Sequence, residues 1–417
     1  MAKQINIGII GLGNIGSAVA SNIRKNHSVI LDNTGIDIKV KKVCDVRRIK
    51  TPYPFTLNPM EIIKDPNISV VVEAIGGVNP ALKFILAALN NGKSVVTPNK
   101  EVIAKHMKEI FAAARKNRVQ VMFEGAVGGG IPIIQPLRES LAGNKIEQVY
   151  GIVNGTTNYI LSKMMEEQME FGQALKKAQE KGYAEPDPTA DIKGYDACYK
   201  AAILASVAFG AEVNWKDVHF EGITRITQED IQYARDIGYV IKLLAIAKKV
   251  DNKLEVRVHP ALIGRTHPLA SVSENFNAIY VKGDPMGQLM FYGPGAGGGP
   301  TASAIISDII AIANDKCQMT NVKLRSYPIK RIDEIESRYY IRLQVPDKSG
   351  VLAGISKAFA RKKVSIAAVV QKETVGDLAT LVVLLHQVSE KNLKAALKVI
   401  EKLPVVRKVC NVIRIVS

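Results

Sequence analysis

The segment KGYAEPDPTADIKGYDACYK, residues 181–200, places acidic side chains, two interior prolines and a lysine directly before an apolar run. Each proline lacks an N–H and biases the preceding residue toward extended backbone, so we expect Glu185 on a kinked loop. From about Asp191 onward the sequence predicts a helix, on which Asp196 and Lys200 share a face because they lie four residues apart. Two carboxylates and a lysine could therefore meet in one acid–base site. The alternative is a solvated Asp/Lys pair on a surface helix.

A glycine-rich turn near the start of the chain predicts a second chemical site. The stretch INIGIIGLGNIGSAVASNI combines an apolar strand, a GxGxxG motif and a helix; the motif glycines are Gly11, Gly13 and Gly16. They allow a tight turn, close approach of a pyrophosphate and close helix packing, and the phosphates would lie at the helix N-terminus. The alternative is a sheet of the same type that binds no cofactor.

The next strand, within IDIKVKKVCDVRR, carries the residues that would select the cofactor. It ends at Asp45, whose carboxylate could accept the ribose 2′-hydroxyl of NAD. The guanidinium groups of Arg47 and Arg48 could instead bind the 2′-phosphate of NADP. Both nicotinamide cofactors therefore remain open at this point.

Further apolar strands alternate with helical stretches in this part of the chain, which favours an α/β fold with a doubly wound parallel sheet. Ligands of such sheets collect beyond the carboxyl ends of the strands. Three segments fall there, at residues 73–77, 97–100 and 124–130. Lys100 follows a proline in a short turn at a strand end, which makes it a candidate for chemistry as well as for a solvent-exposed lysine.

The pattern of elements divides the chain into successive parts. We expect residues 1–136 to form the NAD(P)-binding Rossmann domain, completed by a helix at 300–316. We expect residues 137–299 to form a central α+β domain that has a mixed sheet and binds the substrate. Residues 317–337 would form a linker. Residues 338–417 have the order βαββαβ, which is typical of a ferredoxin-like domain.

Composition narrows the classes of protein. The 417 residues are 47% hydrophobic and 23% charged, as in folded domains, and no apolar run is long enough to span a bilayer. With no signal-type start, we expect the cytoplasm. The net charge of +17 raises nucleic acid as a partner, but the C-terminal lysines spread over two helical faces without aromatic residues, so we expect none. The scattered cysteines, Cys44, Cys198, Cys317 and Cys410, predict neither a disulfide framework nor a zinc site.

Four stretches, in this order along the chain, carry a family resemblance: TPNKE, FEGAVGGGIPI, VNGTTNYIL and KGYAEPDPTADIKGYDACYK. With them the chain resembles homoserine dehydrogenase over essentially its whole length, including a C-terminal ACT-type regulatory domain. The resemblance implies reversible NAD(P)H-dependent reduction of L-aspartate 4-semialdehyde to L-homoserine, in threonine, methionine and isoleucine biosynthesis. It also implies a homodimer formed through the central domain, to which the ACT-type domain could add tetramer contacts.

The resemblance assigns roles to particular residues. Glu185 would bind the amino group of the substrate, Asp196 would lie in the same pocket, and Lys200 would supply the proton. Lys100 would be the second catalytic lysine. Further substrate contacts would come from Thr156 and Tyr183. A lysine suits the reaction because the oxygen that gains charge during hydride transfer needs a positioned cation with a removable proton.

The resemblance also implies a cofactor site and a cation site. NADP or NAD, with NADP favoured, would lie against the glycine motif, Asp45 and Lys100, and against Leu12, Asn14, Ile15, Arg47, Thr97 and Gly297. A monovalent cation, Na⁺ or K⁺, would be held by the carboxylate of Glu124 and the backbone carbonyls of Val127, Gly129 and Ile131. Threonine is a candidate effector at the ACT-type domain.

Two departures from the family pattern limit these expectations. Thr189 and Ala190 stand where many relatives have acidic residues, so we do not expect the outer carboxylates of this loop to be catalytic. Ser349 in PDKSGVL replaces the proline that is common in ACT-type domains, so threonine feedback is a hypothesis only.

Three alternatives remain to be tested. Aspartate semialdehyde dehydrogenase would need an activated cysteine, but Cys198 lies two residues before Lys200 and should point away from it on a helix. A non-catalytic amino-acid sensor would have no need of the lysines and Asp196. A nucleic-acid binder is suggested by charge alone.

Overall fold

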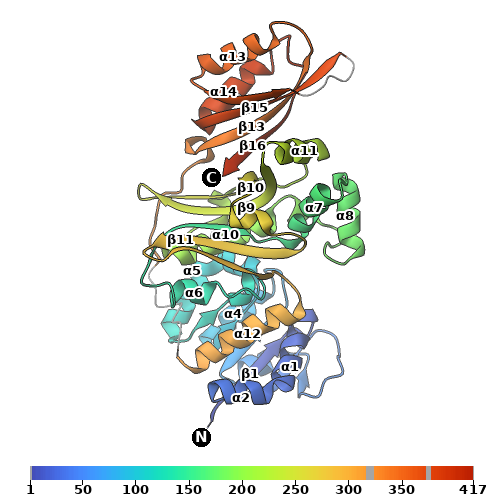
Figure 1. Cartoon of the computed structure of the whole chain (residues 1–417). Helices are drawn as coiled ribbons and strands as arrows, with labels where there is room; N and C mark the ends of the chain where they lie inside the picture. The colour runs from blue at the N-terminus through green and yellow to red at the C-terminus, as the bar shows by residue number, and fades with distance from the viewer. Residues whose placement is uncertain (1, 316–323, 372–376, 417) are drawn as a thin grey trace.

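The computed structural model describes residues 2–315, 324–371 and 377–416, which form three units along one long axis (Figure 1). The N-terminal domain lies at one end, the C-terminal domain at the other, and a mixed sheet lies between them. Cys317 and the predicted helix and linker positions from 316 to 323 lie outside the described residues. Among the described residues no helix is long and apolar enough to cross a membrane.

The N-terminal domain is a six-stranded parallel sheet with helices on its faces. The strand order is β3-β2-β1-β4-β5-β6. The chain adds β2 and β3 on one side of β1 and β4 to β6 on the other, and this change of side creates a crevice at the carboxyl ends of β1 and β4. This confirms the doubly wound fold. The strands are β1 (Lys3–Ile10), β2 (Ile36–Cys44), β3 (Phe55–Thr56), β4 (Val70–Glu73), β5 (Ser94–Val96) and β6 (Val121–Met122). The helices are α1 (Asn14–Lys25), α2 (His27–Thr34), α3 (Met60–Ile63), α4 (Ala81–Asn90) and α5 (Lys100–Asn117).

A helix from much later in the chain completes this domain. α12 (Gly298–Ala313) lies beside α1, where the orange helix crosses the blue domain in Figure 1. A Cβ on Gly298 would lie 2.8 Å from Oδ1 of Asn14 and 3.3 Å from its backbone oxygen, so the two helices approach closely here. α12 starts two residues before its predicted position, and its N-terminus lies beside the N-terminus of α1.

The central domain is a mixed sheet covered by helices, in which the long strands pair antiparallel and the short β8 pairs in parallel with β10. Its strands, in the order β12-β11-β7-β9-β10, are β7 (Lys145–Ile152), β9 (Tyr239–Val250), β10 (Lys253–Gly264), β11 (Phe276–Asp284) and β12 (Gly287–Pro294), and β8 (His219–Phe220) pairs with β10. Its helices are α6 (Ile134–Arg138), α7 (Gly155–Glu166), α8 (Phe171–Glu180), α9 (Thr189–Ile192), α10 (Tyr195–Phe209) and α11 (Gln228–Asp236). The sequence analysis does not identify β9, because an apolar run without alternation fits a buried helix equally well.

The helix predicted from about Asp191 starts later than expected. α9 ends at Ile192, and α10 begins at Tyr195 after Gly194, whose φ of 88° breaks the helical path. Asp196 therefore lies in the first turn of α10, where the helix dipole favours a carboxylate.

The C-terminal domain has the predicted βαββαβ order. Its elements are β13 (Glu336–Pro346), α13 (Val351–Arg361), β14 (Ile366–Gln371), β15 (Leu378–Ser389), α14 (Glu390–Ile400) and β16 (Lys408–Val416). Its edge strand β16 pairs in parallel with β10, so the central and C-terminal sheets form one continuous ten-stranded sheet.

Charged side chains fix the same junction. Arg342 of β13 donates from Nε to Oδ1 of the fully buried Asp230 at 2.6 Å, and from Nη2 to the hydroxyl of Thr227 at 2.9 Å. Asn411 of β16 donates to Oδ2 of Asp230 at 2.7 Å. The N-terminal turn of α11 is thus held by the C-terminal domain.

Candidate active site

A cavity of about 690 Å³ lies at the carboxyl ends of the parallel strands, between the N-terminal and central domains. Its lining brings together segments that are far apart in the sequence. Among the lining residues are Gly13, Asn14, Ile15, Glu73, Asn99, Lys100, Gly129, Glu185, Lys200 and Gly297. Many of the residues predicted to take part in chemistry therefore face a single space.

The centre of this site is the carboxylate of Asp196, which is 4% exposed. Its Oδ1 lies 2.6 Å from Nζ of Lys100, and its Oδ2 lies 2.8 Å from Nζ of Lys200. Lys200 also donates to the backbone carbonyl of Val153 at 2.7 Å. Lys100 is the first residue of α5 in the N-terminal domain, whereas Lys200 belongs to α10, so the carboxylate joins the two domains.

The two lysines differ in their acidity. Burial alone would raise the pKa of Asp196, but the ammonium groups of Lys200 and Lys100 lower it far below its usual range. The pKa of Lys100 is raised, chiefly by the charge of Asp196. The pKa of Lys200 is lowered, first by burial and also by Lys100, although Asp196 opposes both effects. Lys200 is therefore the lysine that gives up a proton more readily.

Asn154 holds two carboxylates in place. It caps the N-terminus of α7 by accepting from the N–H of Thr157 at 2.9 Å. Its side-chain amide donates to Asp191 at 2.7 Å and to Asp196 at 2.9 Å. Burial and the charge of Asp196 raise the pKa of Asp191. The sequence analysis assigned no role to Asn154 and set Asp191 aside. An asparagine between a strand and a helix is a typical cap, but its second function depends on long-range contacts.

Only one of the three predicted substrate-binding residues outside the lysine–carboxylate cluster lines the cavity. The Glu185 side chain is exposed and lines the same cavity as Lys200. Thr156 and Tyr183 are not among the residues that line the cavity. The hydroxyl of Thr156 donates to the backbone carbonyl of Tyr183 at 2.6 Å, and the Tyr183 ring contacts Tyr159 edge-on. These two residues therefore anchor the loop that carries Glu185.

The glycine motif forms a cradle that fits a pyrophosphate. A Cβ on Gly16 would lie 1.8 Å from the carbonyl oxygen of Gly11, and a Cβ on Gly11 would lie 2.5 Å from that of Ala74. Gly297, with φ of 115°, brings the N-terminus of α12 to the same cavity as the N-terminus of α1. The positive ends of two helices thus point to the same cavity, where a pyrophosphate would be stabilised.

A second cavity of about 350 Å³ continues from the glycine motif and fits the other half of a dinucleotide. It is lined by Asp45 and Arg47 and by apolar side chains such as Leu57 and Phe84. The Asp45 carboxylate accepts from the N–H of Leu12 at 2.9 Å and from that of Arg47 at 3.0 Å. The Arg47 side chain remains 72% exposed. Leu12 is therefore buried behind the cradle, and Asp45 and Arg47 stand at the cavity edge.

Thr97 orders the turn before Lys100. It is fully buried, and its hydroxyl donates to Oε2 of Glu73 at 2.6 Å. Burial raises the pKa of Glu73, whose Oε1 accepts from the N–H of Ile75 at 2.7 Å. Thr97 is not among the lining residues, whereas Glu73, to which the sequence analysis gave no role of its own, is.

The carboxylate of the loop predicted to bind a cation has backbone partners in this structure. Glu124 accepts from the backbone N–H groups of Ile133, Ile134 and Gln135 at 2.5 to 2.7 Å, so both oxygens cap the start of α6. An ionised carboxylate has about four lone-pair sites, so these three hydrogen bonds leave room for a cation, and the cation role of Glu124 stays a prediction. Between residues 2 and 416, the described part of the chain has no group of three His, Cys, Asp or Glu suited to a metal. A monovalent cation here would be held by Glu124 together with the backbone carbonyls of Val127, Gly129 and Ile131.

Cys198 does not have the environment of a nucleophile. It is buried, its Sγ lies 3.6 Å from the carbonyl oxygen of Trp215, and burial raises its pKa to about 12. A thiol with a raised pKa is inert at neutral pH, so the alternative that requires an activated cysteine here is excluded.

The dinucleotide cradle and the lysine–carboxylate–lysine chain beside it define a nicotinamide-dependent oxidoreductase. Family models agree: "Homoserine dehydrogenase, NAD binding domain" matches residues 11–124, "Homoserine dehydrogenase" residues 132–310 and "ACT domain" residues 339–405. The chain belongs to the homoserine dehydrogenase family. Its activity is therefore the NAD(P)-dependent interconversion of L-homoserine and L-aspartate 4-semialdehyde, which confirms the activity implied by the resemblance.

Individual relatives cover the whole chain. It is 43% identical to a homoserine dehydrogenase of Helicobacter pylori over 100% of both proteins. It is 41% identical to one of Neisseria gonorrhoeae, with 100% of this chain and 99% of the relative covered. A crystal structure of a homoserine dehydrogenase from Thiobacillus denitrificans superimposes with a TM-score of 0.95 at 41% identity, covering 100% and 99% of the two chains.

Substitution Asn154→Ser should slow catalysis without weakening cofactor binding. Serine keeps the helix cap but lacks the amide that reaches the two carboxylates. Hydrogen bonds to charged groups contribute about 1.5–3 kcal/mol, so we expect kcat to fall by roughly 10- to 100-fold. Steady-state kinetics and cofactor titration check this, with Asn214→Ser, at a helix cap that does not line the cavity, as the matched control. An unchanged kcat would show that Asn154 is only a cap.

Proposed function

We propose that Lys200 is the proton donor when the aldehyde is reduced. A bound NAD(P)H supplies the hydride to the aldehyde carbon, and Lys200 gives its proton to the oxygen that gains charge. The observation that carries this proposal is the position of Lys200: it lines the cavity, is hydrogen-bonded to Asp196 and has a lowered pKa. In the reverse direction the neutral amine of Lys200 accepts the proton of the homoserine hydroxyl.

Lys100 and Glu185 have complementary roles in this proposal. The raised pKa of Lys100 keeps its ammonium charged, so it stabilises the developing alkoxide and gives up no proton. Glu185, on the cavity rim, binds the α-ammonium of the substrate. Asp196 holds both lysines and remains ionised, which excludes it as a proton donor.

Substitution Lys200→Met should reduce kcat/KM by at least about 10²-fold, the usual contribution of a positioned proton donor. In the wild type, homoserine oxidation should rise with pH through a midpoint below that of an ordinary lysine, because the neutral amine is the active form. Aldehyde reduction should fall over the same interval. Assays in both directions measure this, with Lys193→Met, an exposed lysine of the same segment, as the control. A pH-dependent limb that persists unchanged in Lys200→Met would refute the assignment.

NADP is the proposed preferred cofactor. Asp45 already accepts two backbone N–H groups, which reduces its capacity for a ribose hydroxyl, and the exposed Arg47 stands beside the same cavity. An archaeal homoserine dehydrogenase that is 27% identical, with a TM-score of 0.64 over 76% of this chain and 99% of its own, is described in complex with NADPH.

Substitution Arg47→Ser should raise KM for NADP by about tenfold, the value of one charge-assisted hydrogen bond, and leave KM for NAD unchanged. Arg48→Ser is the matched control because Arg48 does not line the cavity. Initial rates with the two cofactors measure both effects. An equal rise in KM for NAD and for NADP would show that Arg47 does not contact the 2′-phosphate.

Further expectations belong to the same proposal. A monovalent cation held by Glu124 and the backbone carbonyls of residues 127, 129 and 131 would tie the loop to the cleft, and titration of the activity with Na⁺ or K⁺ tests this. Exposed apolar side chains on β12, namely Leu289, Met290 and Tyr292, support a dimer through the central sheet.

Threonine feedback through the ACT domain is refuted if millimolar threonine leaves activity unchanged. Cellular location remains a prediction.

A further inference from the structure

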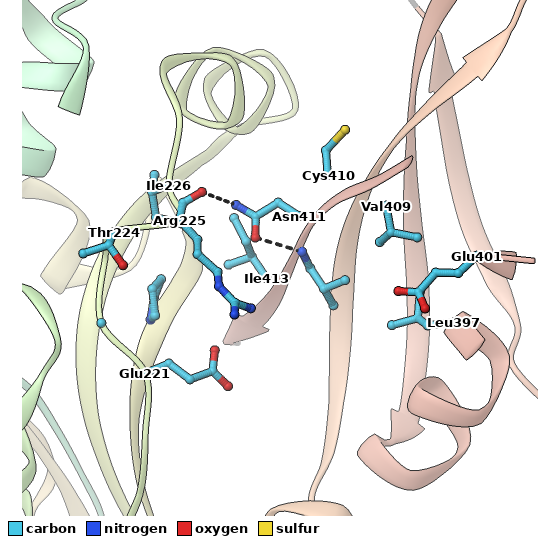
Figure 2. A pocket seen from close by; sticks show the side chains of 13 residues that line it. Glu221, Thr224, Arg225, Ile226, Leu397, Glu401, Val409, Cys410, Asn411 and Ile413 are labelled. Carbon is cyan, nitrogen blue, oxygen red and sulfur yellow. Dashed lines mark hydrogen bonds between the residues drawn. The ribbon is translucent and has the colours of Figure 1, made fainter. Parts of the chain in front are cut away.

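The central domain meets its two neighbouring domains in different ways. On the C-terminal side, β16 pairs with β10, and Asn411 of β16 donates to the backbone carbonyl of Arg225 at 3.1 Å (Figure 2). On the N-terminal side, the six-stranded and ten-stranded sheets are separate in the described part of the chain. The position of Lys100 relative to Lys200 therefore depends on contacts between helices and side chains.

Helix α5 of the N-terminal domain packs against α10 of the central domain. Its first residue is Lys100, which pairs with Asp196. Five residues later, about 7.5 Å along the helix, Lys105 makes a second contact with the central domain. The helical path of α5 then breaks at His106, whose φ is −132°. The turn that carries both lysines is thus separated by a kink from the rest of α5, and its direction depends on what these lysines touch.

Lys105 lies against two aromatic rings of the central domain. Its Nζ lies 5.2 Å from the ring centroid of Tyr199 and 5.4 Å from that of Trp215, and the two rings meet edge-on at 5.2 Å. Tyr199 directly precedes Lys200 on α10, and the carbonyl of Trp215 accepts from Sγ of Cys198 on the same helix at 3.6 Å. An ammonium this close to aromatic rings is attracted by them. Lys105 therefore links α5 to the segment of α10 that carries Lys200.

The Lys105 side chain keeps both its charge and its direction. It is 25% exposed, and its Nζ pairs at 2.5 Å with the carboxylate of Glu101, one turn earlier on α5. Burial alone would lower the pKa of Lys105, but Glu101 and Tyr199 raise it above its ordinary value. Glu101 lines the active-site cavity, whereas Lys105 and Trp215 do not. Any effect of Lys105 on the reaction must therefore be indirect.

We propose that Lys105 is a positioning residue for the reaction. Two contacts, that of Lys100 with Asp196 and that of Lys105 with the two rings, fix both the distance and the angle between α5 and α10. A single contact would fix only one point of the helix. Without the second contact, Lys100 moves away from Asp196 and from Lys200. The proposal rests on the proposed role of Lys200 only where the pH dependence of the reaction is used.

The test compares Lys105→Met, which keeps a long side chain but removes its charge, with Lys105→Arg, which keeps a cation. Lys116→Met, at an exposed lysine in the last turn of the same helix, is the matched control. Lys105→Met should lower kcat by at least about fivefold, within the range of cation–ring contacts, and leave the Kd of the cofactor unchanged. Lys105→Arg should restore most of kcat, and Lys116→Met should not change it.

The pH dependence separates positioning from a direct effect of charge. Because the ammonium of Lys100 lowers the pKa of Lys200, its withdrawal in Lys105→Met should move the midpoint of homoserine oxidation to higher pH. The double variant Lys100→Met/Lys105→Met should have the same midpoint as Lys100→Met alone, because Lys105 acts through Lys100. If the midpoint of the double variant moves further, Lys105 acts through its own charge and the proposal is wrong.

The fluorescence of Trp215, the one tryptophan in the sequence, reports the contact without an assay of activity. Its emission spectrum should differ between wild type and Lys105→Met and stay unchanged in Lys116→Met. An unchanged spectrum or kcat in Lys105→Met, or a loss of kcat that Lys105→Arg does not restore, would overturn the proposal. If the pH-dependent limb persists in Lys200→Met, the role of Lys200 is wrong, and the spectrum and kcat still decide on Lys105.

Discussion

The rest of this structure depends on the burial of one negative charge, that of Asp196. A carboxylate removed from water is costly unless cations and hydrogen-bond donors replace the lost hydration. Here Lys100 and Lys200 supply the cations and Asn154 supplies a donor. Because the lysines come from different domains, the charge is satisfied only when the domains meet. The need to pair Asp196 therefore fixes the cleft in which the reaction takes place.

The same arrangement separates the roles of two chemically identical side chains. Lys200 is buried and faces both a carboxylate and another ammonium, whereas Lys100 keeps a half-exposed side chain beside the same carboxylate. Their pKa values move in opposite directions as a result. One lysine is suited to give up a proton and the other to remain charged. Hydride transfer to an aldehyde needs both, a proton donor for the oxygen and a fixed cation that stabilises its developing negative charge. Environment, not residue type, assigns these tasks.

Local patterns predicted much of the site, and long-range contacts decided the rest. The glycine spacing predicted the cradle, and the four-residue spacing placed Asp196 and Lys200 on one face. Gly194 was a local signal for a break in the expected helix, because glycine readily adopts the positive φ that it has here. Its close approach to the backbone of residue 221 is a long-range contact that the local pattern does not show. The capping role of Glu124 and the pairing of β16 with β10 likewise arise between residues distant in the sequence. Asn154 was recognisable as a helix cap, but its contacts with two carboxylates were not.

The most direct test of this account is the pH profile of homoserine oxidation in Asp196→Asn and Lys100→Met beside wild type. Asp196 raises the pKa of Lys200 and Lys100 lowers it. The midpoint of kcat/KM should therefore move to lower pH in Asp196→Asn and to higher pH in Lys100→Met, whatever the loss of rate. If both midpoints stay at the wild-type value, or move in the same direction, Lys200 is not the group whose proton controls the reaction.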